Sequence, residues 1–265
     1  MRQRTRWAPV LAIVAAGAVA AACTQSATAP GTTAPLGGST SSSRVTLSVA
    51  GGSGTGASAS MTPALSVSQT SGSDELVLDS VSLVLREIEL KRQEDDTCES
   101  SADACEEFET GPILLSLPLD GTVDQQVSVD VPAGTYDELE FEIHKPEDDG
   151  NEVDQAFLQD HPDFARISIR ARGTFNGTDF TFTSDLNAEQ EKALAPALVV
   201  DGSSGPTNVT LSVDASTWFV AGDGSLIDPS TANKGGANEN LVKDNIIASI
   251  RTFEDRDEDG AEDGS

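Results

Sequence analysis

Hydrophobic and polar residues alternate over much of the chain between Val45 and Val213. A period of two is typical of β-strands with one buried face, because successive side chains of a strand point to opposite sides. The pattern predicts strands or hairpins over residues 45–49, 76–92, 113–119, 127–131, 139–143, 167–184, 194–200 and 209–213. The chain is therefore expected to consist mainly of about eight strands.

The longest of these segments, residues 76–92, contains a slip in its pattern. Val81 and Leu85 share one face, whereas Ile88 continues that face only if one extra residue precedes it. An extra residue in one strand is a β-bulge, which returns the later hydrophobic side chains to the buried face. We expect this bulge at Arg86-Glu87.

Residues 167–184 predict a hairpin. Asn176-Gly177 at its centre suits a type I′ turn, which needs two residues that tolerate positive φ. Counting outward from the turn places Ala171 opposite Phe182 on one face and leaves Arg170 on the other. One face of the hairpin is therefore expected in the core and the other in solvent.

Beyond the strands, the spacing changes to that of a helix. Apolar residues recur at helical intervals after a capping Asn238 or Asn240, namely Val242, Ile246, Ile250 and Phe253. The fold class predicted from all these patterns is all-β. It is a single antiparallel β-sandwich, Ig-like or transthyretin-like, of about eight strands with a C-terminal helix packed on it.

The first 23 residues have the layout of a secretory signal. Three arginines precede a short apolar stretch over residues 8–19, and Ala20-Ala21-Ala22 leads to Cys23. A transmembrane anchor is the alternative, but a bilayer span needs about 20 apolar residues. The segment resembles the signal and lipobox of bacterial lipoproteins, which implies a lipid on Cys23. Thr24 replaces the aspartate that would imply retention at the inner membrane, so we expect the outer membrane of a Gram-negative cell.

These patterns divide the chain into four parts. Residues 1–22 are the signal peptide, and residues 23–43 are the lipidated cysteine with a flexible tether rich in Ser, Thr, Ala and Pro. Residues 44–254 are the β-sandwich domain, and residues 255–265 are an acidic tail. The tether would hold the domain away from a membrane surface.

The composition is strongly acidic. The formal net charge of −28 becomes −31 when residues 1–22 are removed, because they hold three arginines and no acids. Such a field repels nucleic acid and anionic lipid headgroups, and it favours cationic ligands and divalent metal ions. Nucleic acid is therefore excluded as an expected partner.

The three cysteines have two expected roles. Cys23 is assigned to the lipid, which leaves Cys98 and Cys105 as a pair in an oxidising compartment. Zinc is the alternative, but the intervening residues 99–104 include no histidine. We expect a disulfide that closes this short loop, worth about 2.5 kcal/mol in the chain-entropy model.

The acidic tail contains the one metal-binding pattern that suggests a cofactor. Carboxylates at alternate positions before a glycine can converge on a calcium ion, and the candidate ligands are Asp255, Asp257, Asp259 and Asp263. The pattern is similar to the start of an EF-hand loop and to the acidic repeats of thrombospondin-type modules. A solvated acidic tail is the alternative.

Two histidine patterns are weaker. Glu140, Glu142 and His144 share one strand face and could present metal ligands. The more usual outcome is a solvated face, for which Arg170 and Arg172 on a neighbouring strand are the candidate partners. His161 and Asp163 could suggest acid–base chemistry, but the proline between them favours an ordinary turn. We assign no catalytic residues.

Several motifs together resemble an uncharacterised bacterial family of exported or lipid-anchored β-sandwich domains. They are the apolar pattern from Val81 to Leu90, the turn from Val131 to Tyr136, and residues 161–186. The family has no established catalytic residues, so none are transferred, and we expect a non-catalytic binding or structural module of the cell envelope. Its expected partners are the membrane, through the lipid, and an envelope protein or polysaccharide. A calcium-stabilised adhesion domain and an extracytoplasmic hydrolase are the alternatives.

Overall fold

The computed structural model describes residues 42–51, 66–93, 107–108, 111–147, 150–201 and 207–262. Residues 39–265 form one compact unit, and residues 1–38, a second unit, lie outside the described ranges. The signal, the tether, Cys23, Cys98 and Cys105 are likewise outside them. Within these ranges, neither α-helix has the length and apolar character that a membrane crossing requires.

The smaller of two sheets has four strands in the order β12-β11-β1-β6. Its strands are β1 (Ser42–Gly51), β6 (Val123–Pro132), β11 (Thr207–Val213) and β12 (Ile250–Glu254). β1 pairs with β6 and β11 with β12 in the antiparallel sense, but β1 and β11 run parallel. The expectation of a purely antiparallel fold is therefore wrong at this central pair.

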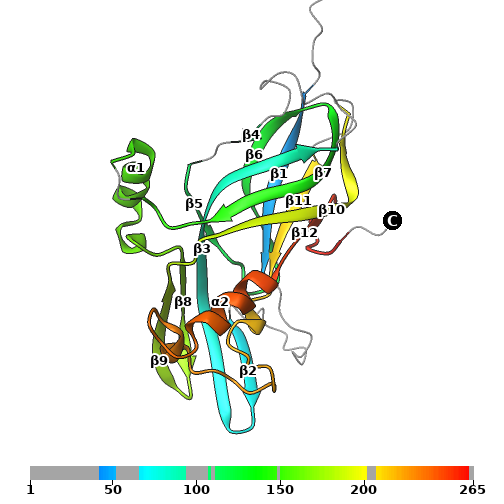
Figure 1. Cartoon of the computed structure of the whole chain (residues 1–265). Helices are drawn as coiled ribbons and strands as arrows, with labels where there is room; N and C mark the ends of the chain where they lie inside the picture. The colour runs from blue at the N-terminus through cyan, green and yellow to red at the C-terminus, as the bar shows by residue number, and fades with distance from the viewer. Residues whose placement is uncertain are drawn as a thin grey trace, which may run out of the picture. The chain divides into compact units, whose positions relative to one another are not determined.

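The larger sheet is organised around the 19-residue strand β3 (Asp74–Arg92), which pairs with five other described strands of this sheet (Figure 1). Its main order is β10-β7-β3-β8-β9, and three short strands also pair with β3. The main strands are β7 (Gly134–Ile143), β8 (Ile169–Phe175), β9 (Thr178–Ser184) and β10 (Ala188–Val200). The short ones are β2 (Val67–Ser71), β4 (Glu107–Phe108) and β5 (Ile113–Ser116).

The predicted bulge and the predicted hairpin are both confirmed, whereas the strand predicted over residues 113–119 ends at Ser116. The pairing of β3 with β7 shifts between Arg86 and Glu89, and Glu87 has a φ of 49°, so the bulge lies where the slip predicted it. The β8–β9 hairpin turns at Asn176-Gly177, both with positive φ, and pairs Ala171 with Phe182. A second bulge, between Leu78 and Ser80, was not predicted.

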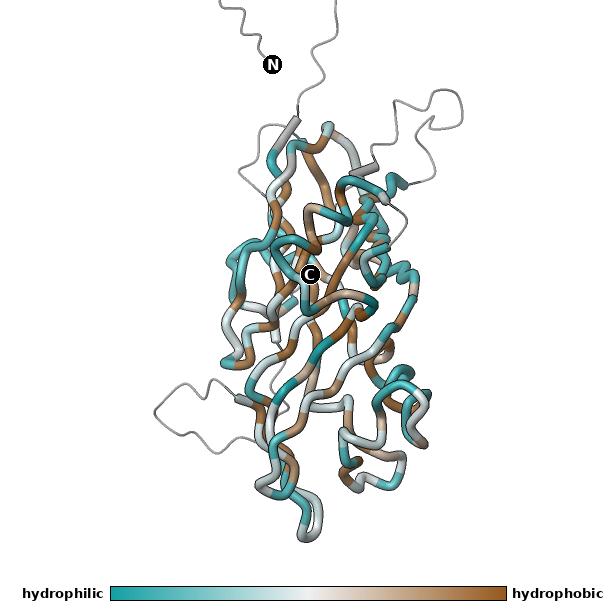
Figure 2. Tube along the Cα trace, turned by 90° about the vertical axis from the view of Figure 1, so that its left-hand side faces the viewer, coloured by the Kyte–Doolittle hydropathy of each residue, from teal (hydrophilic) through white to brown (hydrophobic). Residues whose placement is uncertain are grey.

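One hydrophobic core joins the two sheets. Val49 of β1, Leu211 of β11, Leu83 of β3 and Phe141 of β7 are all buried in the same cluster. Figure 2 shows hydrophobic and hydrophilic positions alternating along much of the trace. The protein is thus mostly β-structure in two sheets, consistent with a β-sandwich. The described residues contain twelve strands rather than about eight.

Helix α1 (Glu152–Asp160) lies between β7 and β8, where no helix or strand was predicted. β7 and β8 pair with successive stretches of β3, and Val84 of β3 links them: its carbonyl accepts from His144 N–H and its N–H donates to Ser168. The Val84 side chain is buried with Phe157 and Phe164 in a second small cluster. The chain from α1 to Phe164 therefore covers the outer face of the sheet at this point.

Helix α2 (Glu239–Ala248) corrects the predicted C-terminal helix. Val242 and Ile246 are buried on it as expected, but the helix ends at Ala248, with Ser249 as its C-cap. Ile250 then pairs with Val213 as the first residue of β12, and Phe253 lies on the same strand. The spacing of three between Ile250 and Phe253 is that of a helix and places them on opposite faces of the strand, so the pairing with the edge of β11, not the apolar spacing, determines the structure here.

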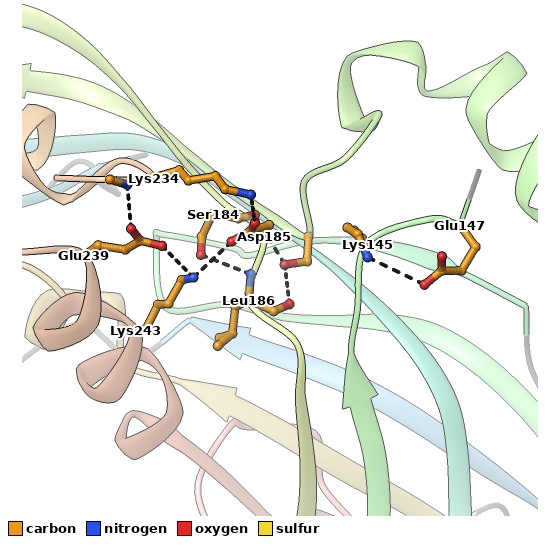
Figure 3. A network of polar contacts seen from close by, with 10 residues as sticks. Lys145, Glu147, Ser184, Asp185, Leu186, Lys234, Glu239 and Lys243 are labelled. Atoms are coloured by element: carbon orange, nitrogen blue, oxygen red, sulfur yellow. Dashed lines mark hydrogen bonds and ion pairs between the residues drawn. The ribbon is translucent and has the colours of Figure 1, made fainter. Parts of the chain in front are cut away.

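Ion pairs fix α2 to the end of β9 (Figure 3). Asp185 accepts from Lys243 Nζ at 3.0 Å and from Lys234 Nζ at 2.5 Å, and Lys243 also lies 2.8 Å from Glu239. The two ammonium groups lower the pKa of Asp185 to about 2, and the hydrogen bond from Lys234 has the largest effect. This network joins the segment before α2, the helix itself and the larger sheet.

Candidate functional site

The C-terminal acidic segment folds onto the smaller sheet. Asp255 directly follows β12, donates its N–H to the Asn208 carbonyl of β11, and has a fully buried side chain. Asp257 and Asp259 are exposed, yet one carboxylate oxygen from each of the three aspartates lies within 4.8 Å of the others. Asp263, the fourth predicted ligand, lies outside the described residues. The alternative of a wholly solvated tail is wrong at Asp255.

Hydrogen bonds to Asp255 shape this turn. Its Oδ1 accepts from Asp259 N–H at 3.1 Å, and its Oδ2 accepts from Gly260 N–H at 3.1 Å. Gly260 has a φ of 79°, and a Cβ there would lie 2.9 Å from Val123 Cγ2, so glycine is needed for both conformation and space. The backbone thus brings the alternate carboxylates to one side of the turn.

A row of buried polar side chains supports the turn from below. Ser48 Oγ donates to Asn208 Oδ1 at 2.6 Å, Asn208 Nδ2 donates to Thr210 Oγ1 at 3.1 Å, and Thr210 Oγ1 donates to Asp255 Oδ2 at 2.8 Å. All four side chains are buried. The Ser48, Asn208 and Thr210 side chains lie on the face of β1 and β11 opposite the core. Without the tail, this face would expose its polar residues to solvent.

This arrangement is suited to a hard cation. The described hydrogen-bond partners of the buried Asp255 carboxylate, Thr210 Oγ1 and two backbone N–H groups, are all uncharged. Carboxylate oxygens are the preferred ligands of Ca²⁺, which takes six to eight of them at about 2.3–2.6 Å. The three aspartates would supply part of such a shell, and water or backbone carbonyls would have to complete it.

The predicted ligand row Glu140, Glu142 and His144 does not form one group. Glu140 lies with Glu138 and Glu191, and the ammonium of Lys91 forms ion pairs with all three carboxylates. Lys91 lowers the pKa of Glu140, and Glu140 in turn raises the pKa of neighbouring Glu189. The place of a metal ion among these carboxylates is therefore taken by a lysine. The suggested pairing of the row with the hairpin arginines is wrong, since Arg170 pairs with Asp163.

The two histidines lie near α1 in separate settings. His144 is buried, and its Nε2 lies 3.1 Å from Glu147 Oε1. His161 ends α1, donating its N–H to the Phe157 carbonyl, and its ring centroid is 4.8 Å from that of Phe157. Asp163 pairs with Arg170 rather than with His161. The pattern of His161 and Asp163 is thus part of a turn.

Sequence reasoning missed a polar cleft of about 360 Å³ at the other end of β11. It lies where β11, the start of β12 and the C-terminal end of α2 meet, and it is lined by Ser212, Asp214, Thr217, Asn245, Ala248, Ser249 and Arg251. These residues are spread over 40 positions without a motif. The pairing of β12 with β11 brings these residues together, and the sequence did not indicate it because residues 250–253 were predicted to be helical.

Comparison with known proteins leaves the family open: no family model, curated protein or solved structure matches the chain. The resemblance to exported bacterial lipoproteins therefore stays a prediction.

Proposed function

We propose that this protein is an exported β-sandwich, held to the cell envelope by a lipid on Cys23, that acts as a non-catalytic binding module. The signal-like first 23 residues, the following stretch rich in small polar residues and the acidic composition support this. An Ig-like or transthyretin-like form of the sandwich, and a location at the outer membrane of a Gram-negative bacterium, belong to the same proposal.

The polar cleft is the observation that carries the binding role. It is lined by one cation and one anion, Arg251 and Asp214, which form no ion pair with each other or with another described residue. Elsewhere in the described chain the candidate reactive groups serve structural contacts, as His161 does at the end of α1. Asp214 uses only Oδ1 to cap the short helix over Ala215–Thr217, through Ser216, so its Oδ2 and the Arg251 guanidinium are the groups left for a ligand.

Membrane fractionation tests the anchoring. Cells producing the full chain should retain it in the membrane fraction, and Cys23→Ser should release it. Cys98→Ser is the matched control and should remain membrane-bound. Retention of the Cys23→Ser protein would overturn the lipid anchor, and turnover of an ester or polysaccharide panel by the purified chain would replace the binding role with a hydrolase.

A calcium-stabilised adhesion domain is the second candidate. It is favoured by the buried Asp255, whose described partners are neutral and whose carboxylate lies beside those of Asp257 and Asp259. Calcium titration followed by thermal unfolding separates it from the first candidate, because the first requires no metal. An envelope protein or polysaccharide is the proposed partner in both cases.

A further inference from the structure

We propose that the polar cleft binds a small zwitterion, a molecule with one ammonium and one carboxylate group such as a free α-amino acid or a short peptide. This inference rests on the binding role proposed above and names its ligand class. The carrying observation is a cleft whose lining includes the second carboxylate oxygen of Asp214 and the guanidinium of Arg251, neither of which has a described hydrogen-bond or ion-pair partner.

One side of the cleft offers acceptors for an ammonium group. Asp214 Oδ1 is used by the N–H and hydroxyl of Ser216, at 3.1 and 2.5 Å, whereas its Oδ2 has no partner among the described residues. Asn245 Nδ2 donates hydrogen bonds to the carbonyls of Trp218 and Val220, at 3.0 and 2.9 Å. Its Oδ1 is therefore the atom left free, because the reverse orientation would set three oxygens against one another.

The end of α2 adds to this preference. Ala248, its last residue, and Ser249, its C-cap, both line the cleft. The carboxyl end of a helix carries a partial negative charge, which favours a cation within the last turn. An ammonium group with three N–H donors would thus meet a carboxylate oxygen, an amide oxygen and a negative helix end.

Arg251 supplies the opposite charge. It is exposed, lies opposite Ser212 in the pairing of β11 with β12, and forms no described hydrogen bond or ion pair. Its guanidinium presents donors in the fork geometry that binds a carboxylate through two parallel hydrogen bonds. Asp214 is a diagonal neighbour, at a typical spacing of about 7–8 Å, so a small ligand can reach both charges.

The cleft floor is held in place by buried contacts. Trp218 is fully buried and donates its indole N–H to Ser249 Oγ at 2.9 Å, and Ser249 Oγ donates to the Ile246 carbonyl at 2.7 Å. Asp214 N–H donates to the Ser249 carbonyl at 3.2 Å. The acceptor side is therefore positioned before a ligand arrives, which reduces the entropy lost on binding.

Calorimetric titration of the full chain in a mild detergent tests the ligand class. The probes are L-alanine and L-alanyl-L-alanine, each beside an N-acetylated form that lacks the ammonium and an amide that lacks the carboxylate. We expect at least one zwitterion to bind with a Kd on the order of 1 mM or below, and its capped forms to bind about tenfold more weakly or not at all. The amino acid and the dipeptide distinguish the two sources of the same chemistry.

Variants locate the binding. Arg251→Gln and Asp214→Asn should each weaken zwitterion binding about tenfold. Arg44→Gln removes the same charge from β1 of the same sheet and should bind as the wild type does. Thermal unfolding confirms that each variant is folded, and Asp214→Asn keeps the acceptor that Ser216 uses.

Three results would overturn the proposal: no zwitterion binding by wild type at about 10 mM, equal binding of the N-acetylated probe, or unchanged binding by both cleft variants. Membrane fractionation is independent of these titrations. Arg251→Gln should remain membrane-bound, so failure of the ligand class and failure of the anchor give different results.

Discussion

Asp255 Oδ2 accepts a hydrogen bond from Thr210 Oγ1 at 2.8 Å, and both side chains are completely buried. The pair joins the acidic C-terminal turn to β11 from the face opposite the core. A buried carboxylate costs free energy unless its oxygens are hydrogen-bonded or neutralised. This one is satisfied by Thr210 and by two backbone N–H groups of the turn. The tail is thus bonded into the fold at its first residue.

The first prediction concerns this anchor. Asp255→Ala should lower the free energy of unfolding by about 2–4 kcal/mol, because it removes the acceptor of three donors in a buried setting. Urea unfolding in the presence of EDTA measures the loss without a metal contribution. The control Asp257→Ala alters an exposed carboxylate of the same turn and should change stability by less than about 0.5 kcal/mol. Equal losses would show that the turn is not held through Asp255.

The second prediction concerns calcium. If the turn binds Ca²⁺, saturating calcium raises the unfolding temperature, since a ligand present at about 100 times its Kd stabilises the folded state by about 2.7 kcal/mol. The double variant Asp257→Asn/Asp259→Asn keeps the Asp255 hydrogen bonds but removes two charged ligands, and should lose most of the shift. Asp244→Asn, an exposed change on α2, should keep it. An undiminished shift in the double variant would place any calcium elsewhere.

The parts of the fold predicted from sequence are those set by near neighbours. The Asn176-Gly177 turn fixes the register of its hairpin, because two residues with positive φ in a two-residue loop determine which residues face each other. The slip in the hydrophobic pattern between Leu85 and Ile88 likewise predicts the bulge that lies there. Each signal lies within a few residues of the structure it predicts.

The parts that were missed depend on contacts between distant residues. The spacing of Ile250 and Phe253 indicates a helix when the sequence is considered locally. Both residues instead lie on a strand that pairs with β11, and Ile250 pairs with Val213, which is 37 residues earlier in the chain. The Asp255 side chain reads as solvated until Thr210 and the turn surround it. The cleft residues Asp214 and Arg251 are brought to the same cleft by the pairing of β11 with β12, so no sequence motif predicts them.

The third prediction tests how the segment around α1 is attached. Phe164 is fully buried beside Val84, and the Arg170 guanidinium lies 4.4 Å from its ring centroid. Phe164→Ala should cost about 3–4 kcal/mol and should speed amide exchange in α1 before it does so in β3. Gln155→Ala, an exposed change on the same helix, is the control. Uniform acceleration in both elements would instead mean that α1 and the sheet unfold together.

The fourth prediction is the pH dependence of the contact between β9 and α2. Lys234 and Lys243 lower the pKa of Asp185 from its ordinary value of 3.8 to about 2, so the folded state binds this proton more weakly than the unfolded chain does. The stabilisation is therefore complete above about pH 5 and is lost as the pH falls through 3.8 toward 2. Because the Asp185 side chain is 21% exposed, we expect a contribution on the order of 1–2 kcal/mol. Urea unfolding of wild type and Asp185→Asn should differ by this amount at pH 6 and converge near pH 2. The control Asp179→Asn changes a residue of β9 that has no described ion pair, and it should show no such convergence. A difference between wild type and Asp185→Asn that persists at pH 2 would contradict the ion-pair origin.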